Sequence, residues 1–137
     1  MFEYRFELGM SSTDPAGVLF YPALFRHAHD AYEALMRDSG LALDTIIGEG
    51  RYALPIAHAE ADYLQPLRHG ESVEVAVVIS TLGESAFTVE FDFRNSAGES
   101  CATARSVHVL LDLATGTPTP LPEPWRARLQ KHLPPQT

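Results

Sequence analysis

Cysteine is almost absent from this sequence, since Cys101 is the only one among 137 residues. A single cysteine excludes an intrachain disulfide and suits a reducing compartment. The chain also lacks an apolar run near the roughly 18 residues that cross a membrane, and its N-terminus has no basic segment followed by an apolar core. We therefore expect a cytoplasmic protein with no membrane partner.

Positive charge is scarce as well. The sequence has 10 Lys and Arg residues against 18 Asp and Glu residues, and its formal net charge of -8 argues against a nucleic-acid partner. It has no Gly-x-Ser-x-Gly motif, so a serine nucleophile is unsupported. A few local arginines are still enough to create a site for an anionic small molecule.

The composition is that of one globular domain, with 45% hydrophobic and 20% charged residues. We expect that domain to cover residues 1–113. Alternate prolines from Pro118 to Pro124 then predict an extended, Pro-rich arm over residues 114–137. A short amphipathic helix is predicted within the arm, at residues 125–133.

Hydrophobic spacing predicts a strand followed by one long helix. Residues 2–8 alternate apolar and charged side chains, which is the period of a strand with one buried face. From Pro22 to Ser39 the period becomes that of an amphipathic helix, with an apolar stripe at Leu24, Ala28, Ala31 and Leu35. Gly40 ends this helix, and residues 41–49 predict a second, short one.

The following segments predict strands at 52–64, 73–79, 87–93 and 101–112, and their short connecting turns imply antiparallel neighbours. Alternation along 52–64 puts small residues on one face, at Ala53, Pro55, Ala57, Ala59 and Ala61. The other face carries Leu54, Ile56, His58, Glu60 and Asp62. Pro55 favours a sheet edge, where the strand can pair with a second copy. The order predicts an α+β fold, with one helix against one antiparallel sheet.

The loop before the long helix carries the best candidate for chemistry. Asp14-Pro15 opens a turn, Gly17 permits backbone angles that a side chain disfavours, and Pro22 suits a first helical turn. One carboxylate therefore precedes the free N–H groups of a helix start, an arrangement that suits a reaction in which negative charge develops on an oxygen. The alternative is that Asp14 only caps the turn.

Among the histidines, His27, His29 and His58 are the functional candidates. His29 and His58 are expected to line a pocket or an interface, each weighed against a structural role. His27 and His29 are two residues apart on a helix and point to different sides, which disfavours a metal site. His69, His108 and His132 are interpreted as surface or structural residues. Cys101 lies within a predicted strand and is interpreted as a core residue.

Three stretches resemble the hotdog-fold acyl-CoA thioesterases of the 4-hydroxybenzoyl-CoA thioesterase family. They are Thr13-Asp14-Pro15-Ala16-Gly17-Val18 with Tyr21-Pro22, then His29-Asp30-Ala31-Tyr32-Glu33, and Leu54-Pro55-Ile56-Ala57-His58-Ala59-Glu60-Ala61-Asp62. The last two are most similar to the branch that hydrolyses 1,4-dihydroxy-2-naphthoyl-CoA. The resemblance implies a hotdog fold and a homodimer or homotetramer, with sites where the helix of one subunit meets a strand of its neighbour.

The resemblance also implies roles for particular residues. Asp14 matches the essential carboxylate, as nucleophile or general base, and the backbone N–H of Tyr21 matches the donor to the thioester carbonyl. Gly17, His29, Pro55 and His58 are the expected substrate-binding residues. No cofactor or metal is implied, because CoA is part of the substrate. Ser12 and His29 stand where many relatives have carboxylates, and no arginine near Leu82-Gly83-Glu84 matches the family's CoA-binding arginines.

Two other functions stay open from the sequence. A hotdog-fold hydratase or dehydratase would use His29 with Glu33, one helical turn later, as acid and base. A non-catalytic acyl-binding protein is the third possibility, because a fold alone does not determine a function.

Overall fold

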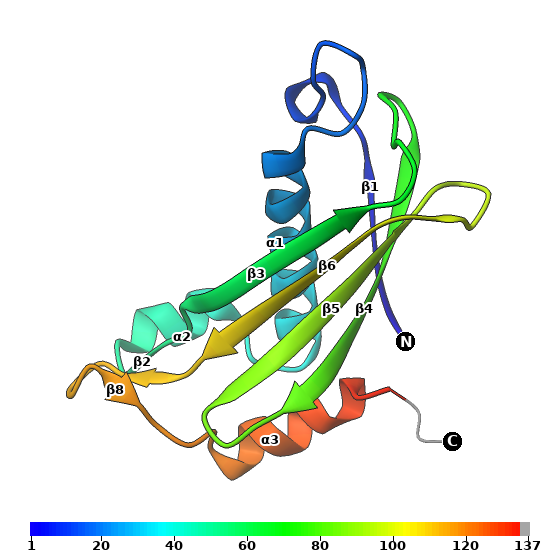
Figure 1. Ribbon diagram of the computed structural model, residues 1–137. Coiled ribbons are helices and arrows are strands. Elements are labelled where there is room, and N and C mark those ends of the chain that lie inside the picture. The colour runs from blue at the N-terminus through cyan, green and yellow to red at the C-terminus, as the bar shows by residue number, and fades with distance from the viewer. Residues whose placement is uncertain (135–137) are drawn as a thin grey trace.

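Five antiparallel strands form a sheet that lies against one long helix in the computed structural model, which describes residues 1–134 (Figure 1). The first half of the chain contains β1 (Phe2–Glu7), the 3-10 helix η1 (Met10–Ser12), α1 (Tyr21–Asp38), α2 (Leu43–Glu49), β2 (Tyr52–Ala53) and β3 (Ile56–Tyr63). The second half contains β4 (Ser72–Leu82), β5 (Ala86–Arg94), β6 (Ser100–Val109), β7 (Leu111–Asp112), β8 (Thr117–Pro118), α3 (Glu123–Leu129) and the 3-10 helix η2 (Gln130–His132).

The strand order in the large sheet is β1-β4-β5-β6-β3, so β1 and β3 are its two edges. Cross-strand pairing aligns side chains of one face in rows, one of which is Phe2, Val77, Phe91, Ala104 and Ala61. This face packs on α1 and forms the hydrophobic core. The predicted α+β arrangement is confirmed.

Helix α1 buries one stripe and exposes the other, as its sequence period predicts. Its buried residues are Ala23, Leu24, Ala28, Ala31, Tyr32, Leu35 and Met36. Pro22 lies in the first turn, where its missing N–H costs little. Gly40, with a φ of +75°, follows the end of the helix in the left-handed region that favours glycine. None of the described helices is long and apolar enough to cross a membrane.

The predicted strand at 52–64 is wrong in two respects. Leu54 and Pro55 interrupt it, so that β2 joins a small sheet and β3 joins the large one. A bulge between Ile56 and His58 then shifts the register against β6, where Ile56 pairs with His108 and His58 with Val107. Because one extra residue inverts the alternation, Ile56 lies on the helix side with the alanines and not beside His58.

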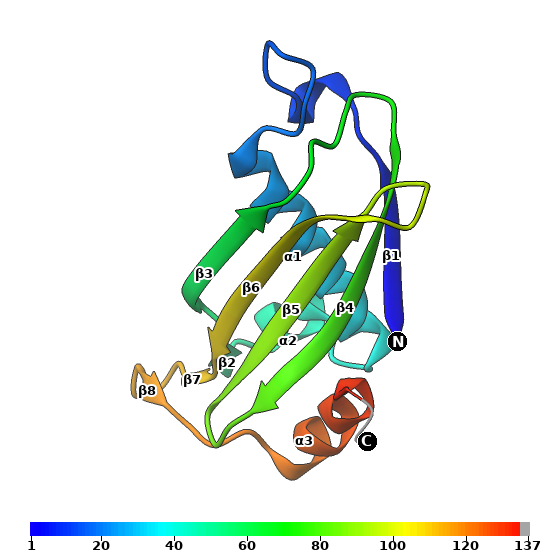
Figure 2. The ribbon, with the colours of Figure 1, turned by 45° about the vertical axis from the view of Figure 1, so that its right-hand side comes forward.

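The chain after β6 contributes to the same core. The strand predicted at 101–112 divides into β6 and β7, and β7 pairs with β2 and β8 in the small sheet. Beyond it, α3 lies below the large sheet (Figure 2). Leu121 and Leu129 are buried there, and Arg126 donates to the carbonyl oxygen of Gly83 at 2.8 Å.

Candidate active site

The loop between η1 and α1 is closed by its own backbone. Phe20 N–H donates to the carbonyl of Ser12 at 2.8 Å, and Asp14 N–H donates to the carbonyl of Val18 at 2.9 Å. Gly17, with a φ of +78°, donates to the carbonyl of Asp14 at 2.9 Å. The tight turn that Asp14-Pro15 and Gly17 predict is present, and it fixes the position of Asp14.

The Asp14 side chain takes part in this turn with one oxygen. Oδ1 accepts the N–H of Ala16 at 2.9 Å and the N–H of Val18 at 3.3 Å. Within residues 1–134, Oδ2 accepts no hydrogen bond. The carboxylate is thus oriented through one oxygen, while the other has its lone pairs free for a substrate or a water molecule.

The start of α1 has one unused backbone donor. Pro22 has no N–H, and the N–H groups of Ala23 and Leu24 both donate to the carbonyl of Phe20, at 2.9 and 3.3 Å. The Tyr21 N–H has no acceptor among the described residues. A free N–H at the positive end of a helix dipole is a suitable donor to an oxygen that gains negative charge.

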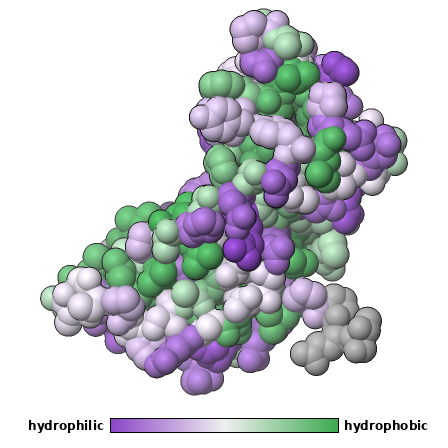
Figure 3. All heavy atoms as spheres, viewed as in Figure 1, coloured by the Kyte–Doolittle hydropathy of each residue, from purple (hydrophilic) through white to green (hydrophobic). Residues whose placement is uncertain are grey.

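Asp14 and Tyr21 line the same surface groove, which has a volume of about 540 Å³ and which we call the Asp14 groove. Its far wall is formed by residues 63–66, at the end of β3. Burial, followed by the Asp14 charge and Tyr21, raises the pKa of Tyr63, which lines the same groove as Asp14. Phe20, Tyr21, Tyr63 and Leu64 are exposed at the groove. In Figure 3, hydrophobic patches alternate with hydrophilic ones over the upper part of the molecule.

The structure brings together only some of the predicted site residues of one chain. Asp14, Gly17 and Tyr21 share the loop and the helix start. His29 lies two turns further along α1, where its Nδ1 is 3.2 Å from Glu33 Oε1. Pro55 precedes β3 at its opposite end, and His58 lies 3.3 Å from Glu60 on the outer face of the sheet.

His29 borders a second space, a cavity of about 100 Å³ between the middle of α1 and the strands β6 and β3, which we call the helix-edge cavity. Its walls include Tyr32, Ala59 and His108. Of the two alternatives predicted for His108, a surface or a structural residue, the structure shows a buried residue whose ring stacks on Tyr32, with centroids 4.0 Å apart. The alternation of side chains along β6 predicts that His108 points inward. No local sequence pattern predicts which residues of α1 it contacts.

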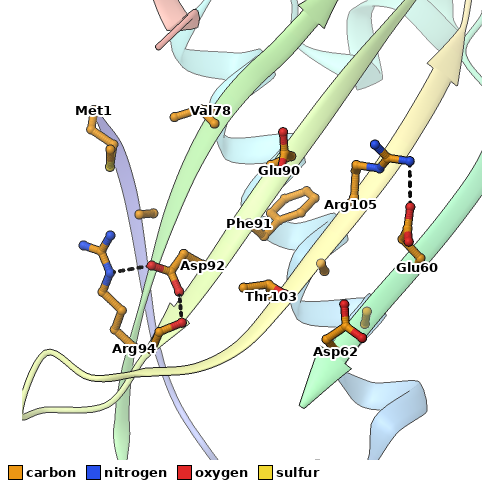
Figure 4. Close-up of a pocket in the computed structure, with 14 residues that line it drawn as sticks. Met1, Glu60, Asp62, Val78, Glu90, Phe91, Asp92, Arg94, Thr103 and Arg105 are labelled. Atoms are coloured by element: carbon orange, nitrogen blue, oxygen red, sulfur yellow. Dashed lines mark hydrogen bonds and ion pairs between the residues drawn. The ribbon is translucent and has the colours of Figure 1, made fainter. Parts of the chain in front are cut away.

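A larger hollow, of about 600 Å³, lies on the face of the sheet that points away from α1 (Figure 4). Four of its charged side chains form two pairs, Arg105 with Glu60 at 2.7 Å and Arg94 with Asp92 at 2.8 Å, while Asp62 and Glu90 line it without an ion pair to the described residues. Neither Asp14 nor the start of α1 reaches it. Because none of the residues of the Asp14 loop line it, we place the chemistry in the Asp14 groove.

No group of three or more His, Cys, Asp or Glu side chains in residues 1–134 is arranged to hold a metal ion. Cys101 is fully buried in the core and does not line the groove. The groove therefore offers one oriented carboxylate and one free helix N–H, which together suit attack on a polarised carbonyl group.

Comparison with known proteins identifies the class of protein that has this fold and site. The family model of the thioesterase-like superfamily matches residues 8–129. No curated protein sequence matches the chain. A solved 1,4-dihydroxy-2-naphthoyl-CoA thioesterase from Synechocystis is 28% identical, with a TM-score of 0.88 over 94% of this chain and 95% of that one.

Two further structures share the fold at lower identity. A gentisyl-coenzyme A thioesterase is 23% identical, with a TM-score of 0.82 over 93% of this chain and 98% of that one. A protein from Staphylococcus aureus, solved in complex with CoA, is 16% identical, with a TM-score of 0.89 over 99% of this chain and 87% of that one. At these identities the likeness concerns the fold alone.

Since the family match spans most of its length, this chain belongs to the thioesterase-like superfamily. It has the hotdog fold and is an acyl-CoA thioester hydrolase. The resemblance in the three sequence stretches is thereby confirmed at the level of family and activity.

Proposed function

We propose that this enzyme hydrolyses an aromatic acyl-CoA to the free acid and CoA, with Asp14 as the catalytic carboxylate and the Tyr21 N–H as the donor to the thioester oxygen. The observation that carries this proposal is the geometry of the Asp14 groove. One Asp14 oxygen is held by two loop N–H groups and the other is free, and Tyr21, whose N–H is unused, lines the same groove.

Two routes use the same residues. In the first, Asp14 Oδ2 attacks the thioester carbon, CoA departs as a thiolate that takes a proton from water, and a second water hydrolyses the mixed anhydride and restores the carboxylate. In the second, Asp14 removes a proton from a water that attacks the carbon directly, and that proton goes to the departing thiolate. In both, the Tyr21 N–H stabilises the oxyanion that forms at the carbonyl.

An aromatic acyl group is supported by the surroundings of the groove and by sequence likeness. Three aromatic side chains, Phe20, Tyr21 and Tyr63, are exposed at the groove. The solved relative at 28% identity acts on a naphthoyl thioester. A 1,4-dihydroxy-2-naphthoyl or a hydroxybenzoyl group is the proposed substrate, and Gly17, His29, Pro55 and His58 are its proposed binding residues.

The proposed assembly is a homodimer or a homotetramer. Strand β3 is a sheet edge with no neighbour on its outer side in the described chain, and seven of its eight residues are exposed, all except Ala61. An unpaired edge of this length is a template for pairing with another strand. Sedimentation equilibrium tests this, since we expect a dimer or tetramer, and a monomer at every concentration would contradict it.

The decisive experiment measures thiol release by Asp14→Asn. This change keeps the shape of the turn but removes the charge and the basicity, so we expect the rate to fall by roughly 10²-fold or more. Asp44→Asn, an exposed carboxylate on α2, is the matched control and should keep its rate. Normal turnover of Asp14→Asn with a lowered melting temperature would show that Asp14 only caps the turn.

A single turnover in ¹⁸O-labelled water then separates the two routes. If Asp14 is the nucleophile and water attacks the aspartyl carbon of the mixed anhydride, the label enters the Asp14 carboxylate. If Asp14 is the general base, the label enters only the product acid, so label in Asp14 establishes the nucleophilic route. Mass spectrometry of the peptide that contains Asp14 reports the difference.

The His29–Glu33 pair supports a second candidate, a hydratase or dehydratase activity, since the two side chains are 3.2 Å apart as acid and base require. A panel that contains an enoyl-CoA tests it. Hydration of the enoyl-CoA that survives Asp14→Asn would favour this activity. Saturable binding of acyl-CoA without turnover would instead indicate a binding protein.

A further inference from the structure

Ser12 connects the two parts of the proposed catalytic machinery, the Asp14 turn and the start of α1. It ends η1 two residues before Asp14, and its carbonyl accepts the N–H of Phe20, the residue before Tyr21. A shift of Ser12 therefore moves the carboxylate and the N–H donor of α1 together. Because Ser12 is buried, other protein groups have to hold its side chain.

The Ser12 hydroxyl bridges two side chains of α1. Its oxygen accepts a hydrogen bond from Arg26 Nη2 at 2.6 Å and lies 2.9 Å from His27 Nε2. The hydroxyl carries one hydrogen, and within residues 1–134 His27 Nε2 is the one acceptor that it contacts. A buried hydroxyl hydrogen is costly to leave unpaired. This pairing requires a neutral His27 ring with its proton on Nδ1.

The surroundings of His27 oppose a second proton on its ring. Burial and then the neighbouring Arg26 charge lower the pKa of His27, and Asp30 opposes them with a smaller effect. Arg26 and Asp30, both on α1, are the charged groups that act on the ring. From β1 it meets Phe6, whose ring stacks on it at 3.9 Å, and from η1 it meets Ser12. Neither of these two side chains carries a charge.

We propose that His27 is a positioning residue for the hydrolysis. While its ring is neutral, it holds the Asp14 turn and the Tyr21 N–H in place through Ser12, and protonation of the ring ends this hold. Protonation converts Nε2 into a donor, so the Ser12 hydroxyl loses its acceptor and faces two positively charged donors. Acid then lowers the rate through a side chain outside the Asp14 groove. This inference rests on the proposed function of Asp14 and Tyr21 and adds a control by pH.

The pH window follows from the lowered pKa of His27. In the folded enzyme the ring is protonated only below about pH 6.5, the ordinary value for histidine, so the full rate is expected above that pH. As pH falls through the pKa of folded His27, kcat should decrease by roughly 10-fold, because displacement of an attacking group slows the reaction. Protonation of Asp14 adds a loss of its own, which is the same in every His27 variant.

The test measures thiol release from benzoyl-CoA and 4-hydroxybenzoyl-CoA between about pH 5 and pH 8. His27→Gln keeps an uncharged acceptor near the position of Nε2, so it should retain the wild-type kcat at the alkaline end and lack the additional loss in acid. His27→Phe keeps a ring on Phe6 but gives Ser12 no acceptor, so it should be roughly 10-fold slower than wild type at the alkaline end. His69→Gln replaces an exposed histidine whose backbone N–H donates to Gly17, and it is the matched control.

Nuclear magnetic resonance provides a readout that does not depend on turnover. The N–H signals of Ala16 and Val18, which hold Asp14, should shift in wild type with the same midpoint as the His27 ring signal. This component should be absent from His27→Gln. Arg26→Gln removes a charge that disfavours protonation of the ring, so it should move the midpoint to higher pH. Circular dichroism at each pH confirms that the proteins remain folded.

An acid loss of the same size and midpoint in wild type and His27→Gln would overturn the inference, and so would a normal kcat of His27→Phe at the alkaline end. Wild type alone is sufficient if neither variant folds, because a midpoint of the Ala16 and Val18 signals that differs from the His27 midpoint would contradict the proposal. Failure of the proposed function has a different result, since Asp14→Asn then keeps its rate whatever the pH dependence of the His27 variants.

Discussion

The hydroxyl of Ser12 lies 2.9 Å from Nε2 of His27, and this contact joins the base of the Asp14 loop to the second turn of α1. Ser12 is 2% exposed, and its oxygen also accepts a hydrogen bond from Arg26 Nη2 at 2.6 Å. Burial and then the Arg26 charge lower the pKa of His27, which favours a neutral ring. That ring stacks on Phe6 of β1 at 3.9 Å, so the loop is attached to both helix and sheet.

Removing this contact should loosen the Asp14 loop. Ser12→Ala leaves His27 without its partner, so we expect a loss of about 1 kcal/mol in unfolding free energy. Misplacement of Asp14 should lower kcat roughly 10-fold, because catalysis depends on the position of the attacking group. Urea unfolding and thiol release measure the two effects, with exposed Ser11→Ala as the control. An unchanged kcat with reduced stability would show that the network only supports the fold.

Gly17 tests how far catalysis depends on the backbone of the turn. A Cβ at this position meets no atom within 4 Å, so Gly17→Ala acts only through the φ of +78°, at a cost of roughly 1–2 kcal/mol. The turn should relax, move Asp14 and lower kcat by roughly 10-fold. Gly9→Ala is a matched control, because its Cβ also meets nothing and its φ is -94°. Equal effects of the two changes would contradict a special role for this turn.

The buried His108 should make the protein less stable in mild acid. In the unfolded chain a histidine binds a proton below about pH 6.5, whereas burial, helped by His29, delays protonation of folded His108 to about pH 4. The unfolded state therefore binds more protons between these values, and the free energy of unfolding falls as pH falls, by roughly 2–3 kcal/mol between pH 7 and pH 4.5. Urea midpoints should show this loss, and His108→Phe should reduce it. The same slope in both proteins would assign it to other groups.

The two histidines expected to bind substrate occupy different places, which makes them a matched pair. His29 borders the helix-edge cavity, and His58 lies near Glu60 on the outer face of β3. We expect His29→Ala and His58→Ala each to lower kcat/KM for aromatic esters by less than Asp14→Asn does, because they position substrate and do not react with it. The panel of acyl-CoA esters measures both changes. If one of the variants has the same kcat/KM as wild type for every ester, the histidine that it lacks has only a structural role.

Most helices and strands could be predicted from the sequence, because the spacing of apolar residues that indicates each of them lies within a short stretch of chain. The stripe of α1 and the alternation of β4, β5 and β6 are examples. The turn at Asp14 was also predictable. Pro15 restricts the backbone angles of the residue before it, and Gly17 permits the positive φ that the turn requires.

Other features depended on contacts between distant segments. The bulge after Ile56 is set by pairing with β6, so alternation alone assigned Ile56 to the wrong face. Tyr63 comes beside Asp14 only because β3 ends where α1 begins. The pairing of His108 with Tyr32 requires the whole order of the sheet against the helix. None of these leaves a signal in a short window of sequence.

The position of α3 has a consequence for synthesis on the ribosome. Arg128 Nη1 donates to the carbonyl of Gly40 at 2.8 Å across 88 residues of sequence, and buried Leu121 and Leu129 complete the core. Because a protein is made from its N-terminus, α3 is still inside the ribosomal exit tunnel when the sheet and α1 emerge, so part of their apolar surface stays uncovered until α3 follows. A chain that stalls at that stage offers this surface to chaperones and proteases, and it becomes resistant to digestion only when α3 has left the tunnel.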